Sequence, residues 1–317
     1  MAAYIARRLA FALFLVVSVS SASFVLTRLA PGDFVTESLG IDARRETIEQ
    51  ARARYGLNKS IASQYGEWIV RAGHLDFGRS LLYDRPVADL IPERAANTAL
   101  LAAAALAMAT LIGLPLGIIT GTRPRGIFTT AIELASLVCL SLPPLLTSLF
   151  LVFVAARTGW LPIGGMASVG SGEHLDVADV LRHALVPATA IALPLTAALE
   201  RLQSQAIRAT IGQGFVRAAL ARGVPRSRVV WRAALKPALR PVASVYGLVI
   251  ATLLSGSFAV EVVTAWPGMG KLMLDALRAR DVYLVAGCAA AGAVFLAFGT
   301  LCSDLALALV DPRARED

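Results

Sequence analysis

The stretch that decides the fold is RLQSQAIRATIGQGFVRAALARGVPRSRVVWRAALKPALR, residues 201–240. It carries nine Lys or Arg residues and no Asp or Glu. Apolar runs punctuated by proline precede and follow it, so it is typical of a loop between two membrane-spanning helices. Lys and Arg are retained in the cytoplasmic loops of membrane proteins. The stretch therefore predicts a large cytoplasmic loop.

The composition supports a membrane protein. Of the 317 residues, 56% are hydrophobic and 16% are charged, and the mean hydropathy is +0.66. A soluble chain of this length has no core large enough for so much apolar surface. Six runs are long and apolar enough to cross a bilayer as helices. They cover residues 9–27, 95–120, 131–156, 184–204, 242–263 and 282–309. The predicted fold class is an all-α membrane protein with six transmembrane helices.

Six spans place both termini on the same side of the membrane, and the positive charge of the short loops favours the cytoplasm for that side. The net charge of +8 follows from the same bias, so it does not indicate nucleic acid. Four regions are expected, of which the second is a large extracytoplasmic segment. They are residues 1–30 with the first helix, residues 31–93, a five-helix core at 94–310 that includes loop 201–240, and a cytoplasmic C-terminus at 311–317.

A short helix is predicted inside the basic loop, at residues 214–222. On a helical wheel, one arc is apolar and the opposite arc carries the charge. The apolar arc holds Phe215, Val216, Ala219 and Leu220, and the opposite arc holds Arg217, Ala218 and Ala221. Gly223 supplies the left-handed residue that ends a helix, and Pro225 prevents its continuation. A second helix is expected from about Arg226 to Lys236.

Two of the expected spans contain features of a packed or bent helix. Gly113, Gly117 and Gly121 form a small-residue stripe, which suits close packing either within this chain or against another subunit. The adjacent Pro143 and Pro144 should kink the third span. Bent helices at membrane depth commonly line a pathway. The candidate pathway or gate residues are Ser141, Pro143, Pro144, Thr147, Ser255, Ser257 and Glu261.

The basic loop resembles the EAA loop of bacterial ABC-importer permeases, in which a coupling helix docks onto the ATPase subunit. Ala218, Ala219 and Gly223 match that motif, and Arg217 stands where the motif has Glu. The rest of the chain resembles the B-type permeases for dipeptides, oligopeptides and nickel. The matching stretches, in the order of that family, are Leu29-Ala30-Pro31-Gly32-Asp33, Asp76-Phe77-Gly78-Arg79-Ser80, Arg85-Pro86-Val87, Trp266-Pro267-Gly268 and Arg280-Asp281.

The resemblance implies the type I importer permease fold and a set of partners. These are a second homologous permease, two cytoplasmic ATP-binding subunits and an extracytoplasmic substrate-binding protein, in a bacterial inner membrane. Residues 215–220 with Gly223 would be the docking element for the ATPase. Peptides, glutathione, nickel chelates and glycosides are all carried by look-alike permeases, so the substrate stays open.

The sequence indicates no catalytic chemistry, metal or cofactor of its own. Gly268-Met-Gly-Lys-Leu lacks the residues of a phosphate loop, and Gly170-Ser171-Gly172 falls in an expected outer loop, which disfavours an intramembrane serine protease. The three His residues do not lie at metal-ligand spacing. The alternative function is a stand-alone secondary transporter. It would need ion-coupling charges deep within the spans, and Glu133 and Asp304 lie near span ends.

Overall fold

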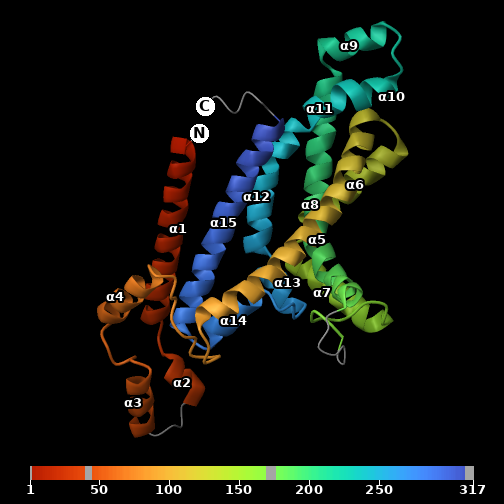
Figure 1. Cartoon of the computed structure of the whole chain (residues 1–317). Coiled ribbons are helices and arrows are strands. Elements are labelled where there is room, and N and C mark those ends of the chain that lie inside the picture. The colour runs from red at the N-terminus through yellow and green to blue at the C-terminus, as the bar shows by residue number, and fades with distance from the viewer. Residues whose placement is uncertain (1, 40–44, 169–175, 311–317) are drawn as a thin grey trace. The chain divides into compact units, whose positions relative to one another are not determined.

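The computed structural model describes residues 2–39, 45–168 and 176–310, which include neither Gly170-Ser171-Gly172 nor residues 311–317. Its described residues form fifteen α-helices and one π-helix, and one isolated antiparallel bridge joins Arg79 to Pro86 (Figure 1). The chain divides into two compact units. The first holds residues 1–99 and 267–297, and the second holds residues 100–266 and 298–317.

Two helices contribute to both units, and the others belong to one. The shared helices are α5 (Val87–Thr122) and α15 (Val282–Val310). The first unit has α1 (Ala2–Leu29), α2 (Phe34–Leu39), α3 (Arg45–Arg54), α4 (Ile61–Ala72) and α14 (Met269–Arg278). The second has α6 (Ile127–Ser141), α7 (Pro144–Thr158), α8 (Val177–Ile211), α9 (Gly214–Ala221), α10 (Arg226–Val229), the π-helix Val230–Ala234, α11 (Leu235–Ala238), α12 (Arg240–Gly256) and α13 (Phe258–Val263).

The predicted spans are confirmed as long apolar helices, with one exception in shape. Five stretches are long and apolar enough to cross a membrane. They are Ala6–Leu29, Val87–Thr122, Val177–Ile211, Arg240–Val263 and Val282–Leu301. The sixth predicted span is a pair of helices, α6 and α7, bent by 102°. The expected kink is therefore a break.

Two prolines explain this break. Pro144 is the first residue of α7, where its missing N–H costs nothing, and it forces the residue before it out of the helical region. Pro143 is accordingly extended, with φ −61° and ψ 138°, and Leu142 is extended as well. Two consecutive non-helical residues end α6 completely instead of bending it.

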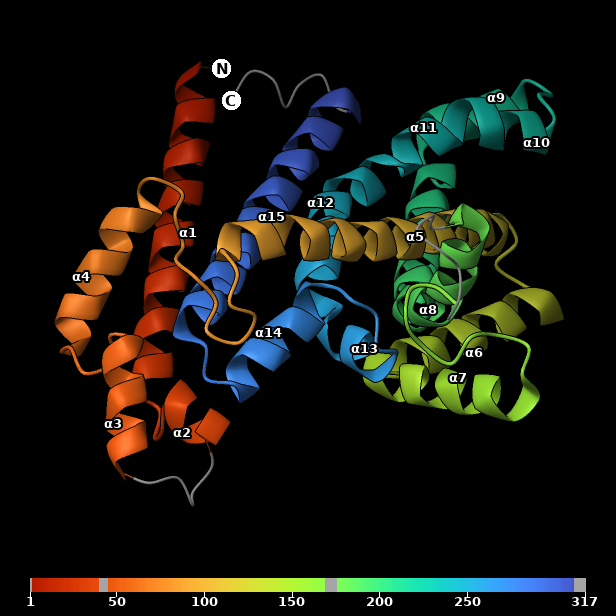
Figure 2. The ribbon, with the colours of Figure 1, turned by 60° about the horizontal axis from the view of Figure 1, so that its bottom comes forward.

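The bent pair follows α8 over most of its length. α6 and α7 both pack along α8 (Figure 2). In the middle of α6, Glu133 accepts a hydrogen bond from Arg208 of α8 at 2.5 Å. Just after α7, the Trp160 carbonyl accepts one from Arg182 of α8 at 3.2 Å. Arg182 and Arg208 are about 39 Å apart along α8 at 1.5 Å per residue. Counted as one broken span, the pair brings the candidate spans of the described residues to six.

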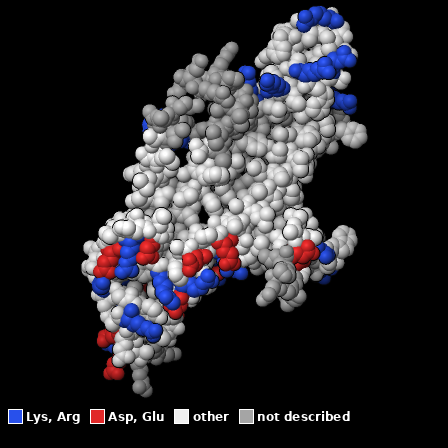
Figure 3. All heavy atoms as spheres, in the orientation of Figure 1, with Lys and Arg blue, Asp and Glu red and all other residues white. Residues whose placement is uncertain are grey.

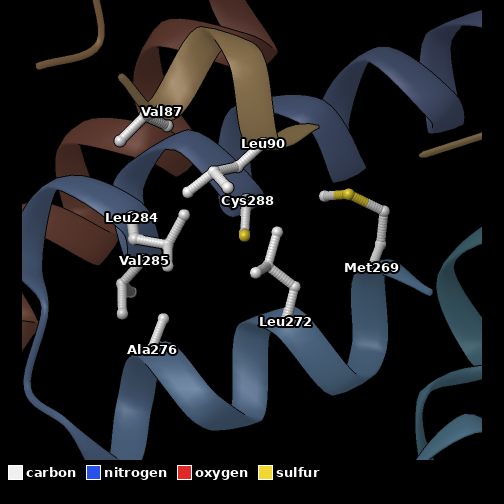
Figure 4. Packing of buried hydrophobic residues seen from close by; sticks show 8 residues of the cluster. All are labelled: Val87, Leu90, Met269, Leu272, Ala276, Leu284, Val285 and Cys288. Atoms are coloured by element: carbon white, nitrogen blue, oxygen red, sulfur yellow. The ribbon is translucent and has the colours of Figure 1, made fainter. Parts of the chain in front are cut away.

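The core of the first unit lies where α5, α14 and α15 meet. Side chains from all three helices point toward one another (Figure 4). They are Val87 and Leu90 of α5, Met269, Leu272 and Ala276 of α14, and Leu284, Val285 and Cys288 of α15. Gly287 permits this approach, because a Cβ there would lie 2.4 Å from Cγ1 of Val87.

A buried carboxylate holds two of the resembling motifs together in the first unit. Asp281 accepts hydrogen bonds from Oγ of Ser80 at 2.6 Å and from the backbone N–H of Leu82 at 3.1 Å. It also accepts one from the N–H of Leu284, in the first turn of α15, at 3.1 Å. The Arg280-Asp281 motif is therefore the anchor of the segment that follows Asp76-Phe77-Gly78.

The glycine stripe packs inside this chain. A Cβ at Gly113 would lie 2.7 Å from the carbonyl oxygen of Thr196 in α8. A Cβ at Gly117 would lie 2.6 Å from the carbonyl oxygen of Glu200, also in α8. A Cβ at Gly121 would lie 2.7 Å from Cβ of Ile207. Real Cβ atoms do not approach that closely, so the stripe lets the α5 and α8 backbones touch. The structure thus favours packing within the subunit over a subunit interface for these residues.

Candidate functional site

The short helix of the basic loop is present as α9 and ends as the sequence predicted. Gly223 follows it with φ +81°, in the left-handed region. The N–H of Gly223 donates to the carbonyl of Leu220 at 2.9 Å, and the N–H of Val224 donates to that of Ala219 at 3.3 Å. These two bonds form a Schellman motif, which satisfies the last helical carbonyls and reverses the chain.

The predicted apolar arc of α9 divides into an inner and an outer part. Val216 is only 1% exposed, and Ala219 is half-buried. Phe215 and Leu220 are 47% and 36% exposed, and the opposite arc with Arg217 and Ala218 is also exposed. Val216 anchors α9 to its own chain, while two apolar side chains stay accessible at its edges. Exposed apolar residues on a loop that is otherwise basic are typical of a protein-binding surface.

Arginine side chains tie the loop to the ends of neighbouring helices. Arg226 donates to the carbonyl of Thr122, the last residue of α5, at 2.9 Å. Arg208 donates to the carbonyl of Thr120 at 3.1 Å and pairs with Glu133 of α6. The last carbonyls of a helix carry partial negative charge, which favours a cation there. These contacts join α10 to α5, and α8 to α5 and α6.

The return segment from α10 to α11 is helical, but it contains a π-turn that the sequence reading missed. Residues Val230–Ala234 form the π-helix, and the helical backbone continues through Pro237 instead of ending before it. Proline removes one backbone donor and crowds the carbonyl four residues earlier. A wider turn just before Pro237 is one known way to accommodate this, and π-bulges are frequent at functional sites. Lys and Arg side chains are prominent on the surface around α9 to α11 (Figure 3).

The sequence reading also missed a buried carboxylate, Glu200, which lies within the fourth predicted span. Glu200 is 1% exposed, and its Oε1 accepts a hydrogen bond from Oγ1 of Thr120 at 2.5 Å. The other oxygen, Oε2, and the amide of the buried Gln203 have no hydrogen-bond partner among the described residues. The sequence signal for this residue is an acidic side chain inside an apolar span, because such residues are rare and usually functional.

An apolar groove of about 290 Å³ lies in the second unit, between the break of the third span and the fifth span. Pro144 at the start of α7 and Pro194 inside α8 form one wall. Leu248, Thr252 and Gly256 of α12 form another. Of the predicted pathway residues, Pro144 lines this groove.

The hydroxyl groups proposed for the pathway bond to nearby groups of their own segments. Ser141, which is exposed, donates to the carbonyl of Leu137 at 2.9 Å. Thr147, which is buried, donates to the carbonyl of the exposed Pro143 at 3.2 Å. Such back-bonding is common for lone hydroxyls in helices. The side chain of Ser255, in α12, lies outside the described residues.

Glu261 lies in α13, and its side chain is buried and does not reach solvent. Its Oε1 accepts a hydrogen bond from Oγ of the buried Ser257 at 2.7 Å. Glu261 is therefore not a solvated helix end. Acidic residues within membrane spans are commonly functional, which makes Glu261 a candidate.

Comparison with known proteins identifies relatives along the whole chain. Residues 113–316 match the family described as "Binding-protein-dependent transport system inner membrane component". Residues 1–102 match the N-terminal region described for membrane components of such systems. The chain is 32% identical over 315 residues to the oligopeptide transport system permease protein AppB of Bacillus subtilis, covering 99% of each chain. It is 28% identical over 316 residues to the "Probable peptide ABC transporter permease protein y4tP" of Sinorhizobium fredii, covering 99% of this chain and 100% of the other.

Proposed function

This chain belongs to the family of binding-protein-dependent transport system inner membrane components and is a permease subunit of an ABC importer, and from this premise we propose that it carries peptides or related small solutes. The names of its relatives support peptides. We further propose that it forms half of the translocation pathway, beside a second homologous permease. The other partners would be two cytoplasmic ATP-binding subunits, which carry the ATPase activity, and an extracytoplasmic substrate-binding protein.

The observation that carries this proposal is the construction of α9. Val216 fixes the helix from inside, the Schellman motif at Gly223 ends it, and Phe215 and Leu220 remain exposed. A helix that is held firmly yet presents apolar edges suits insertion into a groove of a partner protein. The arginine contacts that join α10 to α5, and α8 to α5 and α6, would then convey movement of the ATPase to the spans.

A paired substitution tests the docking surface. We expect Phe215→Ala with Leu220→Ala to weaken ATPase binding by about 2 kcal/mol or more, roughly thirtyfold, because buried apolar anchors dominate such interfaces. Co-purification of the ATPase and transport in proteoliposomes measure this. Val70→Ala is the matched control, since Val70 is 65% exposed but lies in segment 31–93. Equal losses in both variants, or none in the pair, would contradict the proposed surface.

We propose that both termini and loop 201–240 are cytoplasmic, and that segment 31–93 is extracytoplasmic. The even number of spans and the basic loop support this. Ala62→Cys in α4 and Ala218→Cys in α9 are both exposed positions. A membrane-impermeant thiol reagent should label Ala62→Cys in intact spheroplasts and Ala218→Cys only after lysis. The unmodified chain gives the background from its native cysteines, and the reverse labelling pattern would invert the topology.

We propose that Glu261 helps to close the outer gate, because acidic residues within membrane spans are commonly functional and the bond from Ser257 holds this side chain in place. Glu261→Ala should lower transport and raise the basal ATPase rate of the assembled importer. Membrane levels of the variant, measured by immunoblot, separate this effect from misfolding. Normal levels with both rates at the parental value would leave Glu261 without a gating role.

A stand-alone secondary transporter remains the alternative. Glu200 is the buried charge that such a carrier would need, but family membership and the exposed α9 favour the ABC importer. Transport by the purified chain without an ATPase, lost in Glu200→Gln, would support the alternative.

A further inference from the structure

We propose that a cavity beside α4 binds the glycerophosphate group of an anionic phospholipid. The cavity has a volume of about 230 Å³ and lies wholly in the first unit. Arg54, Lys59 and Arg71 line it, together with Glu67. It is smaller than the pockets that hold drug-sized ligands, which are about 300–1,000 Å³. Its size therefore suits a head group better than a peptide.

The charges of the cavity select an anion. Three cationic side chains face one carboxylate, and Glu67 is already paired with Lys59 at 2.5 Å. The hydrogen bond from Lys59 outweighs the small effect of burial and lowers the pKa of Glu67, so this carboxyl is ionised at neutral pH. The two arginines still leave a net positive charge. Arginine is well suited to phosphate oxygens, because its planar group donates two parallel hydrogen bonds.

A buried amide shapes one wall of the cavity. Gln64 is 3% exposed and lines the cavity. Its amide nitrogen donates to the carbonyls of Leu57 at 3.4 Å and Lys59 at 2.8 Å, which holds the turn that carries Lys59 in place. An ammonium group on the ligand would be repelled by the three cations, so a head group with an uncharged end fits the cavity better.

The cavity lies next to the end of the first candidate span, Ala6–Leu29. Arg28, near the end of that span, donates a hydrogen bond to the carbonyl of Leu57, which directly follows Gly56 of the cavity lining, at 3.4 Å. Tyr65 of α4 donates a hydrogen bond to Ser21 of α1 at 2.9 Å, and Trp68 stacks on Phe24 with ring centroids 5.1 Å apart. Aromatic and basic residues near the end of a span are typical of contacts with head groups. Phosphatidylglycerol combines an anionic phosphate with an uncharged glycerol group, which suits the net positive charge of the cavity.

Native mass spectrometry of the purified full chain tests the site, with phosphatidylglycerol and phosphatidylethanolamine of equal acyl chains. We expect phosphatidylglycerol to bind at least about tenfold more tightly than phosphatidylethanolamine, and Arg54→Gln with Arg71→Gln to abolish that preference. Arg45→Gln, at an exposed position of α3 outside the cavity, is the matched control and should keep it. Unchanged preference in the double variant, or no preference in the parent, overturns the proposal.

Two further measurements complete the test. Thermal melting of the double variant checks that it folds. If it does not fold, the proposal is judged by whether the parent binds phosphatidylglycerol more tightly than phosphatidylethanolamine. Free glycerol 3-phosphate is added as a competitor. Failure to displace phosphatidylglycerol supports the lipid as the ligand, whereas displacement at equal concentration assigns the same chemistry to a soluble glycerophosphate.

Discussion

Replacing Gly223 by Val is expected to abolish transport while the protein still reaches the membrane. Gly223 has φ +81°, where a β-branched residue is strained by about 1–2 kcal/mol. A Cβ at this position would meet no atom within 4 Å, so a larger side chain would not clash with the rest of the chain. The effect comes from the backbone, because the Schellman bonds to Leu220 and Ala219 require this conformation. Once they are lost, α9 no longer presents Phe215 and Leu220 at a fixed angle.

Matched variants separate conformation from size at this position. Asn tolerates the left-handed region better than other non-glycine residues, so Gly223→Asn should keep most ATPase association, and Gly223→Ala should fall between Asn and Val. Quantitative co-purification of the ATPase, peptide uptake and membrane abundance are measured for all three. An order that follows side-chain volume instead, with Asn as damaging as Val, would indicate a clash with the partner. Parental transport by Gly223→Val would remove α9 as the coupling element.

The sequence predicted the features of this fold that depend on local chemistry. Six apolar runs identified the spans, because burial in lipid needs about 20 apolar residues whatever the tertiary structure. Gly223 with Pro225 predicted the end of α9, because backbone conformation there is a property of the residue itself. The prolines at 143 and 144 predicted a bend, although not a break of 102°, since its angle depends on the packing of both halves along α8.

Features that depend on neighbours distant in sequence could not be read in the same way. The apolar arc of α9 gave no means of telling Val216, which is buried, from Phe215, which is exposed. The π-turn before Pro237 arises from how the return segment packs, and its sequence resembles that of an ordinary helix. Glu200 is different, because its charge within an apolar run was visible and was overlooked. Its partner Thr120, eighty residues away, was not predictable.

The second large effect is expected at Gly117, on the face of α5 that touches α8. We expect Gly117→Ala to destabilise the permease by about 3 kcal/mol, because overpacking alone costs about 1–3 kcal/mol. The added methyl group would lie 2.6 Å from the carbonyl oxygen of Glu200 and 2.7 Å from Cβ of Gln203, so the helices must separate. Separation also stretches the bond from Thr120 to Glu200, whose other carboxylate oxygen has no hydrogen-bond partner among the described residues. A buried charge that loses its donor adds to the cost.

Gly292 of α15 provides the matched control for this prediction. It is also a helical glycine in a span, but a Cβ there would meet no atom within 4 Å. Gly292→Ala should melt at or above the parental temperature, since Ala favours helix over Gly by about 1 kcal/mol, whereas Gly117→Ala should melt several degrees lower and accumulate poorly. The measurement is thermal unfolding of the isolated permease, followed by assembly with its partner permease. If Gly117→Ala melts normally alone but fails to assemble, the stripe serves the subunit interface instead. A contact with the partner permease does not affect the melting temperature of the isolated chain, whereas a contact within the chain does.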